Sequence, residues 1–173
     1  MKYKFYLISI LFLFNLMSYA QESNFKANAL TAAVISSDSE KSLHFYKDIL
    51  GLQDAGVIEI DSAFAKRLGL SDNVPFHVDV LKFSDSSESP NLKIVSFNTE
   101  SKTEPVNTFI EKQLGLQYLT LNVHSLNAIM EAINNEGIKT EGETPIKLAE
   151  DRYLLLVKDP DGVFIELIGD YDE

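Results

Sequence analysis

The chain has 173 residues and a formal net charge of −11, with 26 acidic against 15 basic side chains and no cysteine. Without cysteine it forms no disulfides and cannot be a lipoprotein attached through an N-terminal Cys, so its stability must come from a hydrophobic core. A surface this acidic disfavours nucleic acid and anionic membranes as partners.

The first 20 residues have the order of a secretory signal. Lys2 and Lys4 precede a mostly apolar run over residues 5–17, and Ser18 and Ala20 are the small residues at −3 and −1 before Gln21. The run is shorter than the roughly 20 residues that a membrane span needs. The sequence therefore predicts that residues 1–20 are a removed signal peptide and that the protein is periplasmic or secreted. Removal leaves 13 basic against 26 acidic side chains in 153 residues, enough for one domain.

The first half of the remaining chain reads as a strand, a helix and three more strands. Residues 30–35 (LTAAVI) are the first strand. Ser37 and Glu40 have the spacing of a capping box, which predicts a helix that starts there and ends at Gly51. The other predicted elements are strands over 53–60, 76–83 and 92–97 and a short helical turn over 62–68.

The second half repeats this order after a connector, in which residues 104–114 are predicted to be helical. Its predicted elements are a strand over 118–123, a helix from Ser125 to near Gly137, an extended stretch over 139–149, and strands over 152–158 and from 163 onward. The last two strands are joined by Asp159-Pro160-Asp161-Gly162, which has type I turn chemistry. No Gly-rich phosphate loop, Ser-His-Asp spacing or Cys/His metal cluster appears in the sequence.

Glu166 is unexpected in the last strand, because its neighbours are Ile165 and Leu167 within an apolar run. A carboxylate in such surroundings costs several kcal/mol unless it is paired, protonated, solvated or bound to a metal. Alternation along a strand places Phe164, Glu166 and Ile168 on one face and Ile165 and Leu167 on the other. Which of these four states Glu166 adopts therefore distinguishes between the possible functions of the protein.

Two segments together resemble the vicinal oxygen chelate superfamily, which includes glyoxalase I, bleomycin-resistance proteins, extradiol dioxygenases and methylmalonyl-CoA epimerase. "SSDSEKSLHFYKDILGL" (residues 36–52) is similar to the first helix of these proteins, and "KDPDGVFIELIG" (residues 158–169) to their final hairpin. "LGLSDNVPFHVDVLKF" is similar to a loop and strand of glyoxalase-like members. The resemblance implies an α+β fold of two βαβββ modules curled around one cavity. It implies one domain over residues 29–169, with module one at 29–98, a connector at 99–115 and module two at 116–169.

In metal-using members of this family, the first and last strand of each module each direct one ligand into the cavity. By the resemblance, these four positions fall on Thr31, Lys93, Tyr118 and Glu166. Only Glu166 is a ligand of the family's type, since Thr and Tyr are poor neutral ligands and a protonated ammonium cannot coordinate. The usual metal site is therefore broken, and we expect neither a metal nor another cofactor.

The same face of the strands implies a mostly apolar cavity with a few polar groups, the usual composition of a small-molecule site. The predicted lining residues are Thr31, Ala33, Lys93, Tyr118, Thr120 and Glu166, with His77 and Arg152 as further candidates. If the four metal positions converge, Lys93 supplies part of the missing positive charge, and we expect it to pair with Glu166. On that expectation, Lys93→Met costs about 3 kcal/mol by orphaning a buried charge.

Of the other histidines, His44 is predicted to be solvent-exposed on its helix, and His124, which precedes a helix start, to be a local cap or a surface residue. His77 on its strand faces either the cavity or the helix, and Arg152 at a strand mouth is either an anion contact or a surface residue.

Three functions agree with these observations. The first is an exported, metal-free binding module that holds a small organic molecule, as bleomycin-resistance members do. The second is a glyoxalase-like lyase or isomerase that uses an atypical metal site at Glu166, or acid–base catalysis by Glu166 and Tyr118. The third is an interaction protein with a filled cavity. The resemblance also implies that a homodimer can form.

Overall fold

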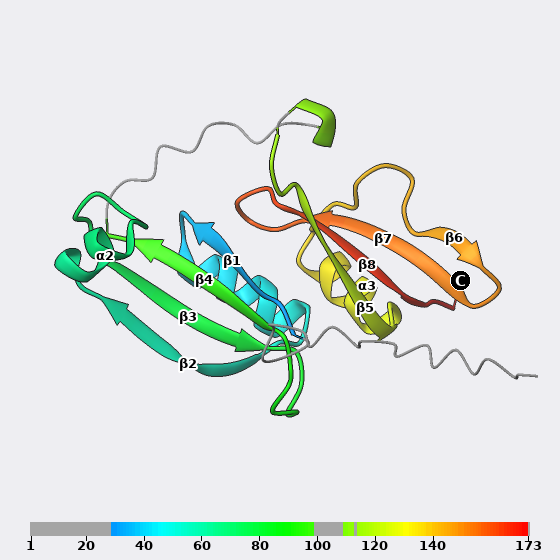
Figure 1. The fold of residues 1–173 in the computed structure, drawn as a ribbon. Helices are drawn as coiled ribbons and strands as arrows, with labels where there is room; N and C mark the ends of the chain where they lie inside the picture. Colours follow the sequence, from blue (N-terminus) through cyan, green and yellow to red (C-terminus); the bar gives the residue numbers. More distant parts are fainter. Residues whose placement is uncertain (1–28, 99–108, 113, 173) are drawn as a thin grey trace, which may run out of the picture.

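The fold is α+β and consists of two successive βαβββ modules, each built on a four-stranded mixed sheet (Figure 1). A computed structural model describes residues 29–98, 109–112 and 114–172. The predicted fold class is thus confirmed. The predicted signal peptide lies outside the described residues, as does most of the helix predicted over 104–114. Its described part contains the 3₁₀ turn η2 (Ile110–Lys112).

In module one the strand order is β1-β4-β3-β2, with β1 parallel to β4 and the other pairs antiparallel. The strands are β1 (Thr31–Ser36), β2 (Gln53–Ile60), β3 (Phe76–Lys82) and β4 (Asn91–Phe97), and the short helix α2 (Ser62–Leu68) follows β2. Each of these elements lies where the hydrophobic pattern predicts it, within one residue at either end.

Module two repeats this topology in the order β5-β8-β7-β6, again with its first and last strands parallel. Its elements are β5 (Tyr118–Ser125), α3 (Asn127–Asn135), β6 (Ile146–Ala149), β7 (Arg152–Lys158) and β8 (Phe164–Asp170). The extended stretch predicted over 139–149 is a strand only in its last four residues. None of the helices in the described ranges is long and apolar enough to cross a membrane.

The first helix differs from its prediction in its cap and in its winding. Asp38, rather than Ser37, is the N-cap residue of α1 (Ser39–Leu43), and its side chain accepts a hydrogen bond from the amide of Lys41. The helix then continues as a π-helix, η1 (His44–Ile49), in which the amide of Leu50 bonds the carbonyl of Phe45. The capping box predicted for Ser37 and Glu40 is therefore wrong.

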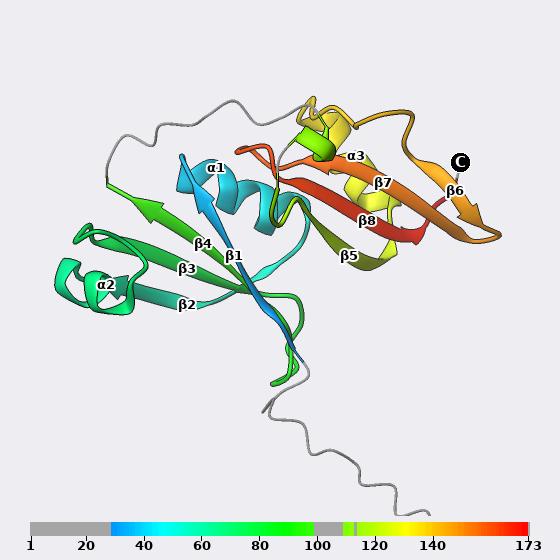
Figure 2. The same ribbon diagram turned by 45° about the horizontal axis from the view of Figure 1, so that its top comes forward.

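The two modules share one hydrophobic core, and α1 lies between the two sheets in both views (Figures 1 and 2). The core joins η1 and α3 to the inner face of each sheet, that is, the face turned towards the helices. Its fully buried members include Tyr46, Ile94, Ile133, Leu155 and Leu167. Because the modules meet through these inner faces, the opposite, open face of each sheet is free to form a site.

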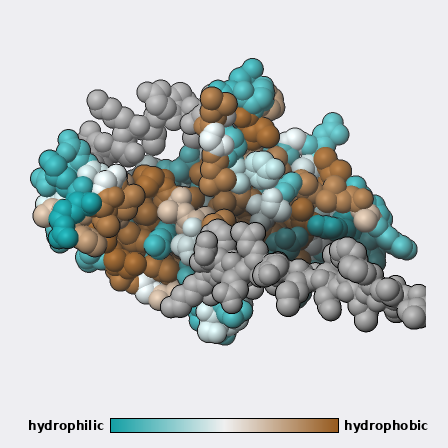
Figure 3. All heavy atoms as spheres, viewed as in Figure 1, coloured by the Kyte–Doolittle hydropathy of each residue, from teal (hydrophilic) through white to brown (hydrophobic). Residues whose placement is uncertain are grey.

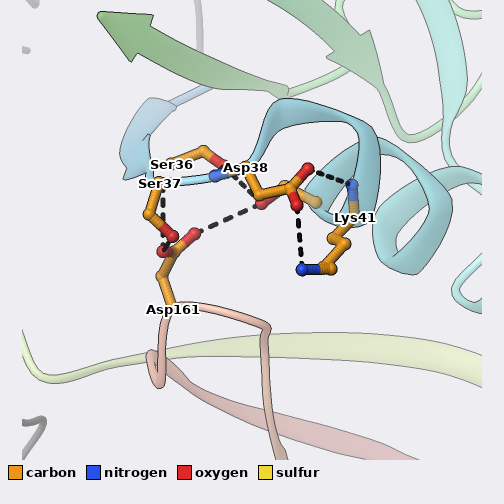
Figure 4. A network of polar contacts seen from close by, with 6 residues as sticks. Ser36, Ser37, Asp38, Lys41 and Asp161 are labelled. Atoms are coloured by element: carbon orange, nitrogen blue, oxygen red, sulfur yellow. Dashed lines mark hydrogen bonds and ion pairs between the residues drawn. The ribbon is translucent and has the colours of Figure 1, made fainter. Parts of the chain in front are cut away.

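The turn between β7 and β8 docks onto the start of the first helix and ties the modules together (Figure 4). Oδ1 of Asp161 accepts hydrogen bonds from the amide of Ser37 at 3.0 Å and from its hydroxyl at 2.5 Å. Oδ2 of Asp161 accepts from the hydroxyl of Ser42 at 3.3 Å. The hydroxyl and amide of Ser37 are thereby committed to the second module, which explains why Ser37 does not cap its own helix.

Asp159, the first residue of the same turn, makes a second and deeper connection. Its side chain is 5% exposed, and Oδ2 accepts a hydrogen bond from the hydroxyl of the fully buried Tyr46 at 2.7 Å. Oδ1 accepts from the amides of Asp161 and Val163. Burial raises the pKa of the Asp159 carboxyl and of the Tyr46 phenol, although the hydrogen bond from Tyr46 lowers that of Asp159 in part.

Candidate functional site

Glu166 lies on the open face of the second sheet, half-buried, while its neighbours Ile165 and Leu167 are fully buried on the inner face. Its carboxylate Oε2 accepts a hydrogen bond of 2.5 Å from the hydroxyl of Thr120. Thr120 stands directly opposite Glu166 in the β5–β8 register, so the contact is a cross-strand pair. The carboxylate therefore has a local partner and partial access to solvent, and it costs far less there than it would on the inner face.

A cavity of about 330 Å³ opens beside this carboxylate. Its lining is Phe109, Ile110, Glu111, Tyr118, Leu156, Phe164 and Glu166. The volume is at the small end of ligand pockets, and the composition, apolar walls with a few polar groups, is typical of them. Among the described residues Oε1 of Glu166 accepts no hydrogen bond. A bound molecule can therefore donate a hydrogen bond to it.

The four positions that the resemblance aligns with metal ligands are divided between the two sheets. Thr31 and Lys93 lie on the open face of the first sheet, where Ala33 is the direct neighbour of Lys93. Tyr118 and Glu166 lie on the open face of the second sheet and line the same cavity. Thr31, Ala33 and Lys93 do not line this cavity.

The ion pair expected between Lys93 and Glu166 does not form. Among the residues that the structure describes, Lys93 has no carboxylate within ion-pair distance, and Glu166 bonds Thr120 instead. The physical reason is that the two side chains project from different sheets, which are joined through their opposite faces.

We therefore expect Lys93→Met to be nearly neutral, with a change in the free energy of unfolding within about 0.5 kcal/mol. The reason is that no buried carboxylate loses a partner when the ammonium is removed. Urea unfolding at neutral pH measures this, and a loss near 3 kcal/mol would contradict the arrangement of the sheets described above.

His77 and Arg152 lie away from Glu166. His77 shares its face of β3 with the buried Leu81, so it is on the inner side, opposite to Lys93. It contacts Glu59 at 2.6 Å and Asp79 at 3.2 Å, and the hydrogen bond that it donates to Glu59 raises the pKa of its imidazole most. Arg152 is four residues from Leu156, the residue opposite Glu166, and so roughly 13 Å along the strand.

His44 makes a contact between modules, and sequence analysis did not anticipate it. Its Nδ1 lies 2.8 Å from Asp48 on the same helix, and its Nε2 lies 3.5 Å from Glu136 at the end of α3. The Asp48 hydrogen bond raises the pKa of this imidazole.

Sequence analysis also missed part of the cavity wall. Phe109 and Ile110 come from the connector, where periodicity predicts helix but gives no indication of which strand face it covers. Their apolar character was the signal available in the sequence. In the structure these two large side chains remain exposed, Phe109 by 61% and Ile110 by 47%, as at a binding surface.

The residues at these positions do not fit a catalytic metal ion. Glu166 is the single anionic ligand type among the four, and its Oε2 is already bonded to Thr120. In the described parts of the chain no group of three or more His, Cys, Asp or Glu side chains could hold a metal ion. The chemistry available at the site is therefore that of the Glu166 and Glu111 carboxylates and the Tyr118 phenol in an otherwise apolar cavity.

Comparison with known proteins agrees with this architecture. A glyoxalase family protein from Bacillus cereus has a TM-score of 0.70 at 13% identity, covering 88% of this chain and 99% of that chain. The trypanothione-dependent glyoxalase I of Leishmania major has a TM-score of 0.58 at 15% identity, covering 81% and 84%. At these identities the likeness shows the fold alone.

In sequence, the chain is similar to the uncharacterized protein YwkD of Bacillus subtilis, with 28% identity over 135 residues, which is 78% of this chain and 91% of YwkD. The model of the Glyoxalase/Bleomycin resistance protein/Dioxygenase superfamily matches residues 29–167. The two modules, their strand order and this match together show that the chain belongs to that superfamily.

Proposed function

We propose that this protein is an exported, metal-free member of the superfamily that binds a small organic molecule at Glu166. The observation that carries the proposal is the Glu166 carboxylate, which Thr120 orients at the wall of an apolar cavity while Oε1 stays available. A half-buried acceptor of this kind selects a ligand that donates a hydrogen bond. The open cavity favours this role over that of an interaction protein with a filled interior.

Acid–base catalysis by Glu166 and Tyr118 is the second candidate, because both side chains line one cavity. In such a lyase or isomerase the carboxylate would take a proton from the substrate and the phenol would donate one. Binding without turnover distinguishes the first function from this one.

The proposal includes a second copy of the chain as partner. Large apolar side chains remain exposed on the open face of the first sheet, with Ile35 54% and Ile58 40% exposed. Hydrophobic residues also gather over β2, β3 and β4 in Figure 3. A homodimer in which these faces are covered would bury that surface.

A native mass spectrum of protein purified from its source tests the binding function. We expect a co-purified organic molecule whose affinity falls about 10- to 100-fold in Glu166→Gln, since a hydrogen bond to a charged group contributes 1.5–3 kcal/mol. Leu148→Gln is the control, because Leu148 is 50% exposed and does not line the cavity at Glu166. One equivalent of tightly bound zinc, nickel or iron in the same sample would overturn the metal-free assignment.

Export is tested by determining the N-terminus of the mature protein. We expect the mature protein to begin at Gln21 or within a few residues of it, because Ser18 and Ala20 suit the −3 and −1 positions of a signal cleavage site. N-terminal sequencing of the protein from the periplasm or medium checks this. Recovery of the uncleaved chain from the membrane fraction would refute export.

A further inference from the structure

A second and larger cavity, of about 720 Å³, lies between the two modules. Its walls are the outer edge of β5, the segment Leu50–Leu52 that follows η1, and the region where β4 begins. In Figure 1, β5 lies at the side of its sheet that is nearest to module one. Of the described residues, Tyr118 alone lines both this cavity and the one at Glu166, so the two are separate spaces on either side of β5.

The cavity exists because module one does not fully cover the inner face of β5. Leu119, Leu121 and Val123 point towards the shared core but are only partly buried. On the adjacent strand β8, Ile165 and Leu167 point the same way and are fully buried. The cavity opens to solvent, so it leaves apolar surface at the edge of the core uncovered.

The lining has no formal charge apart from what His124 can carry. None of the described residues around the cavity is Asp, Glu, Lys or Arg, although these types make up 24% of the chain. A charged ligand would lose its hydration there and gain no ion pair in return. The chemistry of the walls therefore favours an uncharged ligand.

Polar groups are nevertheless present at one side of the cavity. β5 is an edge strand that pairs with β8 alone, so alternate backbone amides and carbonyls of residues 118–124 point away from the sheet. Asn91 and Asn122 are also among the lining residues. A ligand with a carbonyl, amide or hydroxyl group can bond these groups and lay its apolar body on the leucines.

We infer that this cavity is a second binding site, which takes an uncharged and mostly apolar organic molecule with a hydrogen-bonding carbonyl, amide or hydroxyl group. Its volume falls within the range of ligand pockets, about 300–1,000 Å³. The site is independent of the function proposed for Glu166, because Glu166 does not line it.

Nile red is a suitable probe, because it is neutral, apolar and carries a carbonyl group. We expect titration of the purified protein to give saturable fluorescence. Leu116→Glu should weaken Nile red binding at least about tenfold, since it removes an apolar contact at the mouth of the cavity and places a carboxylate there. Leu114→Glu is the matched control: Leu114 is 98% exposed, lies two residues away and lines neither described cavity, so its affinity should stay within about twofold.

Two further variants assign the binding to one cavity. Ala32→Phe fills the cavity between the modules and should weaken binding, whereas Leu156→Trp, which fills the cavity at Glu166, should leave it unchanged. Wild-type affinity in both Leu116→Glu and Ala32→Phe would overturn the inference. So would loss of binding in Leu156→Trp alone. A third result would also overturn the inference. If the wild type is a dimer that binds no Nile red, and Leu116→Glu dissociates this dimer, then a second copy of the chain covers the cavity.

Discussion

Asp159→Ala is expected to lower the free energy of unfolding by about 3 kcal/mol, a fall in Tm of roughly 6–12 °C for a chain of this size. The substitution leaves the buried hydroxyl of Tyr46 without its acceptor. It also removes the acceptor of the amides of Asp161 and Val163, which hold the turn in shape. Each such group costs about 1–3 kcal/mol when it is buried and unpaired. Thermal and urea unfolding measure the loss.

The control is Asp161→Ala, the same substitution two residues along the same turn. Asp161 also ties the modules, through Ser37 and Ser42, but its contacts to Ser37 are exposed, so water can replace them. We expect a loss of no more than about 1 kcal/mol. Equal losses in the two variants would show that depth of burial is not what distinguishes the two aspartates.

The pH dependence of the free energy of unfolding follows from the direction in which the pKa of Asp159 is shifted. Burial raises this pKa in the folded protein above its usual value of 3.8. The folded state therefore holds the proton more tightly than the unfolded state, and the stabilisation from this group is full below pH 3.8 and is lost as the pH rises through the folded pKa. Asp159→Asn does not titrate and keeps an acceptor for the two amides. It should be more stable than Asp159→Ala, with a smaller fall in stability than the wild type as pH rises from about 4 to 7.

Much of the fold could be predicted because its local signals are strong. The strand over Arg152–Lys158 was predicted to the residue, since inward and outward side chains alternate along it. Alternation also placed Glu166 on the face opposite to Ile165 and Leu167, as the structure shows. Both inferences needed only the period of a strand, which the sequence contains directly.

The partners of these side chains could not be predicted, because they depend on how the modules pack. Asp161 occupies the hydroxyl of Ser37 from 124 residues away, so the Ser37 capping box was a sound local pattern that a distant contact overrode. The Lys93–Glu166 pair failed for a related reason. The expected pair required Thr31, Lys93, Tyr118 and Glu166 to converge on one centre, which needs the open faces of the two sheets to meet within one chain. In the structure the two sheets are joined through their inner faces instead.

The last prediction concerns Gly169, the final residue of the KDPDGVFIELIG segment. The sequence alone gives no reason for a glycine at this position. It is buried in β8 and faces Tyr153 of β7 in the register. A Cβ atom added there would lie 2.6 Å from the carbonyl oxygen of Val123 and 2.8 Å from its Cγ2. Real Cβ atoms do not approach other atoms this closely, so β5 would have to move away from β8.

Gly169→Ala should therefore destabilise the protein by about 3 kcal/mol, the upper part of the range for overpacking, even though alanine usually suits a strand better than glycine. The double variant Gly169→Ala with Val123→Ala separates the two contacts. It removes the clash with Cγ2 but leaves the closer one with the backbone oxygen. We therefore expect no rescue: the double variant should lose about as much stability as the two single variants added together. Full rescue in urea unfolding would mean that the side chain alone sets the spacing of the strands. Because Val123 also lines the cavity between the modules, Gly169→Ala should weaken Nile red binding as well, which Asp161→Ala should not.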